Sequence, residues 1–230
     1  MNWRVEQADA LALLRELPDG WAQTCVTRPP RADDPDRTLA ILTEARRVLR
    51  DDGTLWVLLH PDDLSLAGEL QAEGWRRQSS PAWATQRDTA TRPCLFTKGQ
   101  RYFYDARTIG ARSGSPSWLC VGASRQVRRA QTCLPAREHE RGLRLVKRCI
   151  LAGSSVLACG ECGAPYRPTR PGESAPGIRR PTCPHNNPCG RCLVLDPFYD
   201  PACVATAEAA LCTGRSFLGI ADPASTGEGR

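Results

Sequence analysis

The stretch Leu193-Val-Leu-Asp-Pro-Phe198 begins the part of the sequence that decides the fold. Its first three residues are apolar and β-prone, so they predict a short buried strand. A helix over residues 202–211 and a second strand over residues 216–220 are predicted to follow it. A strand, a helix and another strand in succession form the unit from which parallel sheets are built.

The same alternation runs through the rest of the chain. Apolar residues that recur every three or four positions predict helices over residues 9–17, 38–49, 64–73 and 138–151. Asp51-Asp52-Gly53 is predicted to end the second of these helices, before a buried strand at residues 54–59. Further strands are predicted over residues 21–27, 75–84, 94–97 and 101–104. The pattern indicates an α/β fold with a mostly parallel sheet.

Five of the twelve cysteines fall in one segment. This segment contains Cys159-Gly-Glu-Cys162, then Cys183-Pro-His185, then Cys189-Gly-Arg-Cys192. Two Cys-x-x-Cys pairs together with a Cys-x-His have the spacing of zinc ligands, and a redox pair or chance clustering are the alternatives. Residues 165–181 are rich in Pro, Gly and Arg and cannot build a core. A structural zinc ion is therefore expected to hold the segment together.

The positive charge of the chain is concentrated in its middle. The whole chain has 31 Lys+Arg and 25 Asp+Glu, which gives +6. Residues 76–148 contain 16 Lys+Arg and 4 Asp+Glu, which gives +12 and leaves −6 for the rest. A basic middle between acidic flanks suits an anionic partner such as nucleic acid, while an arginine-rich solvated surface is the alternative.

The length and composition suit one ordinary domain with a small added module. No apolar run reaches the ~20 residues of a membrane span, so no membrane partner is expected. The first residues lack the basic-then-apolar order of a secretion signal. The sequence therefore predicts a cytoplasmic protein whose cysteines are metal ligands or buried thiols.

Several segments, taken in order, resemble the DNA amino-methyltransferases, which use S-adenosylmethionine to methylate adenine N6 or cytosine N4. The chain is most similar to the permuted group, in which the catalytic loop precedes the cofactor-binding strand. The matching segments are Asp9-Ala-Leu-Ala-Leu-Leu-Arg-Glu-Leu-Pro-Asp19, residues 44–56, residues 95–106, Leu195-Asp-Pro-Phe198 and residues 214–220.

This resemblance implies a Rossmann-like methyltransferase sheet with helices on both faces and DNA as a partner. Residues 1–158 and 193–230 would form the methyltransferase-like domain, and residues 159–192 a zinc-binding insertion that some family members carry. The ligands that match the family pattern are Cys159, Cys162, Cys183 and His185. Cys189 or Cys192 could replace His185.

The position that matches the family's catalytic loop is Arg28-Pro29-Pro30-Arg31. In the family, this loop reads Asp/Ser/Asn-Pro-Pro-aromatic. Its first residue accepts a hydrogen bond from the amine of the flipped base, and its aromatic ring stacks on that base. Arg28 cannot accept a hydrogen bond, and its fixed charge opposes the positive charge that develops on the attacked amine. Arg31 could still stack its guanidinium plane on a base.

The cofactor turn also departs from the family. The resemblance implies Asp9, Asp196, Phe198, Asp200 and Asp222 as the cofactor-binding positions, with Ala221 standing where a ribose-binding acid is usual. The family has a glycine-rich turn after Asp-Pro-Phe, which lets the backbone approach the cofactor. Here the turn over residues 199–202 is Tyr-Asp-Pro-Ala and has no glycine.

Three changes at functional positions coincide, so methyl transfer is predicted to be lost or weakened. The resulting hypothesis is a DNA methyltransferase-like protein with an altered catalytic loop and an altered cofactor turn. The alternatives are an enzyme with unusual but working sites, and a catalytically inactive relative that binds DNA or a protein partner and carries a structural zinc. A third alternative is a zinc-ribbon interaction module on an inert scaffold.

Overall fold

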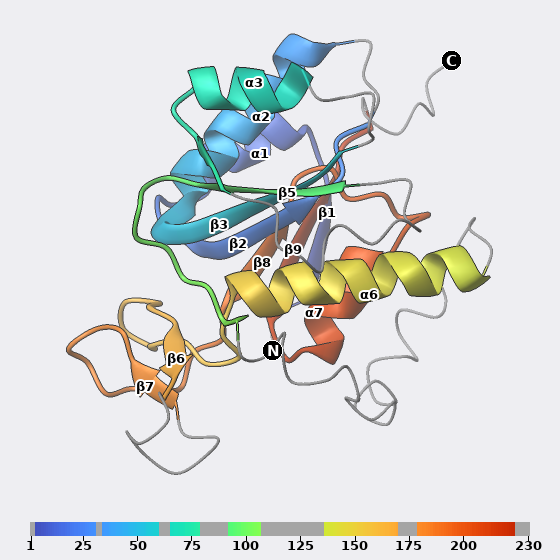
Figure 1. Cartoon of the computed structure of the whole chain (residues 1–230). Helices are drawn as coiled ribbons and strands as arrows, with labels where there is room; N and C mark the ends of the chain where they lie inside the picture. Colours follow the sequence, from blue (N-terminus) through green and yellow to red (C-terminus); the bar gives the residue numbers. More distant parts are fainter. Residues whose placement is uncertain are drawn as a thin grey trace.

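A seven-stranded sheet with the strand order β1-β9-β8-β2-β3-β5-β4 forms the centre of the computed structural model (Figure 1). The structure describes residues 3–30, 34–59, 65–78, 92–106, 136–169 and 179–223. The five parallel strands are β1 (Trp3–Gln7), β2 (Ala22–Thr27), β3 (Leu49–Leu59), β8 (Leu193–Asp196) and β9 (Ser216–Ala221). Strand β5 (Arg92–Thr97) runs antiparallel to β3 and to β4 (Arg76–Arg77). The predicted α/β fold with a mostly parallel sheet is confirmed.

Helices cover both faces of this sheet (Figure 1). One face is covered by α1 (Ala10–Glu16), α2 (Pro35–Val48) and α3 (Ser65–Ala72), and the other by α6 (Ala136–Gly153) and α7 (Ala205–Cys212). Successive side chains of β3 point to opposite faces of the sheet, because side chains alternate along a strand. Leu55 packs in the core under α1 and α2, while Trp56 packs in the core under α6 and α7.

Two local predictions differ from the structure, and one strand is missing from the predicted elements. Helix α2 ends at Val48, and Asp51-Asp52-Gly53 lies inside β3, where the register against β2 shifts between Ala22 and Thr24. Residues 101–104 form no strand, although the Phe103 backbone N–H donates to the Asp52 carbonyl oxygen over 2.8 Å. Strand β1 is absent from the predicted elements, because as an exposed edge strand it has no continuous apolar pattern. Residues 79–84 of the predicted strand 75–84 lie outside the described residues.

A small two-stranded sheet stands apart from the main sheet (Figure 1). It consists of β6 (Tyr166–Pro168) and β7 (Arg179–Pro181), which pair antiparallel. The chain enters this module after α6 and leaves it directly into the first residue of β8. The module therefore adjoins the amino end of β8, not the carboxyl end.

Among the residues that the structure describes, no helix combines the length and the apolar character that crossing a membrane would need.

Candidate functional site

The order of the parallel strands reverses between β8 and β2. From β8 the chain continues through α7 to β9 on one side, and from β2 it continues through α2 to β3 on the other. In open α/β sheets, ligands bind at such a reversal, outside the carboxyl ends of the strands. Thr27 and Asp196 are the last residues of β2 and β8, and the Thr27 hydroxyl donates a 2.6 Å hydrogen bond to the Asp196 carboxylate. The candidate site is therefore the edge around these two residues.

Asp196 is an acid held in an apolar environment. It is only 4% exposed, and burial raises the pKa of its carboxyl group to about 6. Hydrogen bonds from Thr27, Thr206 and the Phe198 backbone N–H act in the opposite direction but do not cancel the cost of burial. Phe198 itself lies in the core on the α1 and α2 face of the sheet.

We expect Asp196→Asn to stabilise the protein in a pH-dependent way. The folded-state pKa of about 6 lies above the ordinary value of 3.8. Ionisation is therefore costlier in the folded state, and this penalty develops as the pH rises from about 4 to about 6. At pH 8, the free energy of unfolding of the variant should exceed that of the unaltered protein by about 2–3 kcal/mol.

Chemical denaturation at pH 4 and pH 8 measures this difference. Near pH 4, where Asp196 is mostly protonated in the folded state, the gain should largely vanish. Asp51→Asn is the matched control, because the Asp51 side chain is fully exposed. An equal gain for Asp196→Asn at both pH values would contradict the prediction.

The turn after β8 is closed by its own side chains. The Asp200 carboxylate accepts a 2.7 Å hydrogen bond from the Ala202 backbone N–H, and Pro201 has no N–H to offer. The Tyr199 ring is buried against Phe217, with ring centroids 5.6 Å apart. It also covers Gly219, where an added Cβ would lie 2.8 Å from Tyr199 Cγ. As arranged here, the turn does not fit the carboxylate of S-adenosylmethionine, because it presents a negative charge in place of backbone donors.

The loop after β2 carries the altered catalytic position. Arg28, Pro29 and Pro30 follow Thr27 at the carboxyl edge, and Arg28 is exposed. Burial has the largest effect on the Cys203 thiol and raises its pKa. The positive charge of Arg28 lowers that pKa by a smaller amount. Arg31 lies outside the described residues. The described part of the loop thus brings a cation, and no hydrogen-bond acceptor side chain, to the edge of the sheet.

Two further predicted cofactor positions lie next to each other. Asp9 caps α1 by accepting from the Ala12 backbone N–H over 2.7 Å, and Asp222 follows β9 and accepts from the Ala10 backbone N–H over 3.0 Å. Arg37 bridges both carboxylates, with Nη2 2.8 Å from Asp9 and 2.7 Å from Asp222. Sequence reasoning does not find Arg37, because a single arginine in the first turn of a helix matches no motif.

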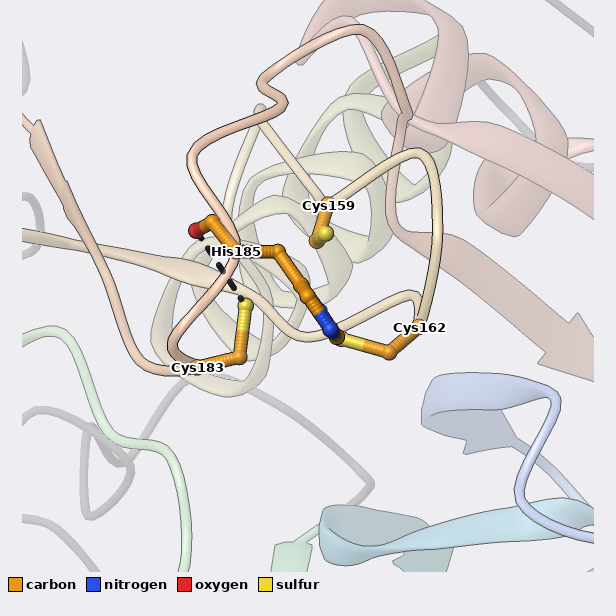
Figure 2. Close-up of side chains that lie close together, drawn as sticks. All are labelled: Cys159, Cys162, Cys183 and His185. Atoms are coloured by element: carbon orange, nitrogen blue, oxygen red, sulfur yellow. Dashed lines mark hydrogen bonds between the residues drawn. The ribbon is translucent and has the colours of Figure 1, made fainter.

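The structure brings Cys159, Cys162, Cys183 and His185 together (Figure 2). Their ligand atoms all lie within 4.8 Å of one another, and His185 Nδ1 lies 3.4 Å from Cys162 Sγ. Ligands of a tetrahedral zinc ion lie about 3.6 Å apart, given Zn–S near 2.3 Å and Zn–N near 2.0–2.1 Å. The pKa of the Cys162 thiol is lowered to about 7. The hydrogen bond from the Ala164 backbone N–H is the largest cause, and the hydrogen bond with the His185 ring is the next largest. The chemistry and spacing of these four groups fit a zinc ion.

The other two cysteines of the segment lie outside this cluster. Cys192 is buried, and its sulfur lies 3.8 Å from the Leu157 carbonyl oxygen. Cys189 is exposed, and its sulfur packs against Gly160, which lies between Cys159 and Cys162 in the sequence.

The cluster is attached to the amino edge of the main sheet. Arg50, the second residue of β3, donates a 2.7 Å hydrogen bond from Nη1 to the Cys162 carbonyl oxygen and pairs with Asp52. Arg191 donates to the Val156 carbonyl oxygen over 3.2 Å. These anchors lie at the edge opposite Thr27 and Asp196, so a metal in the cluster would stabilise the module and take no part in chemistry at the other edge.

Comparison with known proteins gives related sequences and related folds, although no protein-family model matches the chain. The chain is 30% identical over 166 residues to the Type II methyltransferase M.XycI of Xanthomonas campestris pv. cyanopsidis, in a match that covers 43% of this chain. It spans about half the length of the curated relatives it matches, 55% of M.XycI and 57% of M.Cfr9I of Citrobacter freundii.

Solved structures share the fold over nearly the whole chain. The PvuII DNA methyltransferase, which is cytosine-N4-specific, aligns with a TM-score of 0.56 at 14% identity, covering 96% of this chain and 82% of its own. The Thermus thermophilus protein TTHA0409, solved in complex with S-adenosyl-L-methionine, aligns with a TM-score of 0.52 at 17% identity, covering 95% and 88%. The chain is therefore similar in sequence to Type II methyltransferases, and it shares its fold with solved DNA methyltransferases.

Proposed function

We propose that this chain is a DNA methyltransferase-like protein whose methyl transfer is lost or weakened and which retains DNA binding. The observation that carries the proposal is the closed turn, in which Asp200 takes up the Ala202 N–H and adds a negative charge. The carboxylate of S-adenosylmethionine would meet repulsion there and would find few backbone donors. Arg28 adds a second obstacle, because it cannot accept a hydrogen bond from a target amine.

The basic middle of the chain supports the DNA-binding half of the proposal. Arg76 and Arg77 are exposed on β4, and Arg92 is exposed at the start of β5, so three cations lie along the side of the sheet that β4 and β5 form. Residues 107–135, which carry much of the remaining positive charge, lie outside the described residues. Contacts of arginine with phosphate give affinity that depends weakly on base sequence and strongly on salt.

Two binding titrations and one methyl-transfer assay on the full chain test this proposal. Calorimetry with S-adenosylmethionine should give no micromolar binding, and a labelled-methyl assay on duplex DNA should give no transfer above background. Duplex DNA should bind at low salt, and its affinity should fall steeply between 50 and 200 mM salt, by about 10³-fold if six phosphates are contacted. Micromolar cofactor binding with methyl transfer would favour the alternative, an enzyme with unusual but working sites. Absent or salt-independent DNA binding would overturn the DNA-binding half.

We also propose that Cys159, Cys162, Cys183 and His185 hold one structural zinc ion. The support is their convergence, together with the position of Glu161 Oε2, 3.8 Å from His185 Nε2. A carboxylate on the far nitrogen orients a ligand histidine, which leaves Nδ1 directed at the metal site. Among the described residues of the module, few apolar side chains pack together, so the ion would supply most of the module's stability.

A further inference from the structure

Arg37 connects three parts of the carboxyl edge. It is the third residue of α2, and its backbone N–H is held by the Asp34 side chain that caps this helix. Its Nη2 atom reaches Asp222 after β9 and Asp9 before α1. The Asp222 side chain is only 2% exposed and the Arg37 side chain is 30% exposed, so the carboxylate of this ion pair is better shielded from water than that of a surface pair.

The position of Asp222 matters for the kind of ligand it could bind. In doubly wound folds, an acid after the second strand of the nucleotide-binding unit accepts hydrogen bonds from ribose hydroxyls. Strand β9 is that second strand, since it follows β8 through α7 and pairs beside it. A carboxylate that binds a vicinal diol uses both oxygens, one for each hydroxyl. Here Asp222 Oδ2 already accepts from Arg37 and from the Ala10 N–H.

We propose that the Arg37 side chain is an internal occupant of a diol-binding site at Asp222, so that a ribonucleoside binds there only when Arg37 leaves. This inference rests on the proposed function, since it adds a second reason why S-adenosylmethionine binds poorly. The two reasons concern different parts of S-adenosylmethionine. The closed turn hinders binding of the methionine end, whereas Arg37 hinders binding of the ribose.

Adenosine separates these two effects, because it has the diol and lacks the carboxylate. Calorimetry should show that Arg37→Gln binds adenosine at least about tenfold more tightly than the unaltered protein, a difference of about 1.4 kcal/mol. 2′,3′-Dideoxyadenosine, which has no diol, should gain nothing from the substitution. Arg15→Gln, an exposed arginine in the last turn of α1, is the matched control and should leave both affinities unchanged.

Removing Arg37 leaves Asp222 buried without its cation, and this could unfold the protein. A second variant keeps the test informative in that case. Arg37→Lys keeps a positive charge on a shorter side chain, which reaches the two carboxylates less well than Arg37 Nη2 does, and it should give an intermediate gain. An unchanged adenosine affinity in a folded Arg37 variant, or an equal gain for dideoxyadenosine, would overturn the inference. Tight S-adenosylmethionine binding by the unaltered protein would instead overturn the proposed function, so the two failures are distinguishable.

Discussion

Replacing Cys159 by serine is expected to remove zinc from the protein. Purified, reduced protein should contain about one zinc ion per chain, and the variant less than about a tenth of that, because three ligands bind a structural zinc far more weakly than four. The module that contains β6 and β7 should then lose its ordered structure, since its cluster of buried residues is small. Elemental analysis measures the zinc, and the amide signals of residues 159–192 report on the module.

Cys189→Ser is the matched control for this experiment. It lies in the same module, its sulfur packs against Gly160, and it lies outside the ligand cluster. The near-isosteric serine should therefore keep the zinc. His185→Ala should behave like Cys159→Ser. Zinc retained by His185→Ala and lost from Cys189→Ser would show that Cys189 is the fourth ligand, and zinc absent from the unaltered protein would contradict the site altogether.

Most of the fold is predictable from the sequence because the parallel strands inside the sheet are largely buried. Strands are predicted over residues 193–195 and 216–220, and the structure has β8 and β9 there. Strand β1 is not predicted, because it is stabilised by pairing with β9, which lies more than 200 residues away in the sequence. Asp51-Asp52-Gly53 has the local propensity of a turn, which pairing with β2 overrides.

The candidate site is predictable where spacing alone brings residues together. The Cys-x-x-Cys and Cys-x-His spacings fix which side chains can converge, and the structure groups the four that match the family pattern. The contact of Arg37 with Asp9 and Asp222 joins three elements that are distant in the sequence. Such a contact follows from the packing of α2 over the edge of the sheet, for which no short pattern exists.

Restoring the catalytic loop alone is expected to restore no methyl transfer. Arg28→Asp with Arg31→Tyr would return an acceptor for the amine and an aromatic ring for the base. The closed turn would remain, with Asp200 opposing the carboxylate of S-adenosylmethionine. Because transfer needs the base and the methyl donor bound together, a repaired base site without a donor site should stay at background in a labelled-methyl assay.

Rebuilding the turn as well should change this result. Adding Asp200→Gly, Pro201→Ser and Ala202→Gly removes the negative charge and returns backbone N–H groups, so cofactor binding should become measurable by calorimetry. Arg37 would still compete for Asp222 and should weaken that binding by about tenfold without abolishing it. The rebuilt turn with Arg28 retained is the control, and it should bind the cofactor without transferring a methyl group. Transfer by the double variant alone would show that the closed turn does not exclude the cofactor, because the loop would then be the only barrier to catalysis.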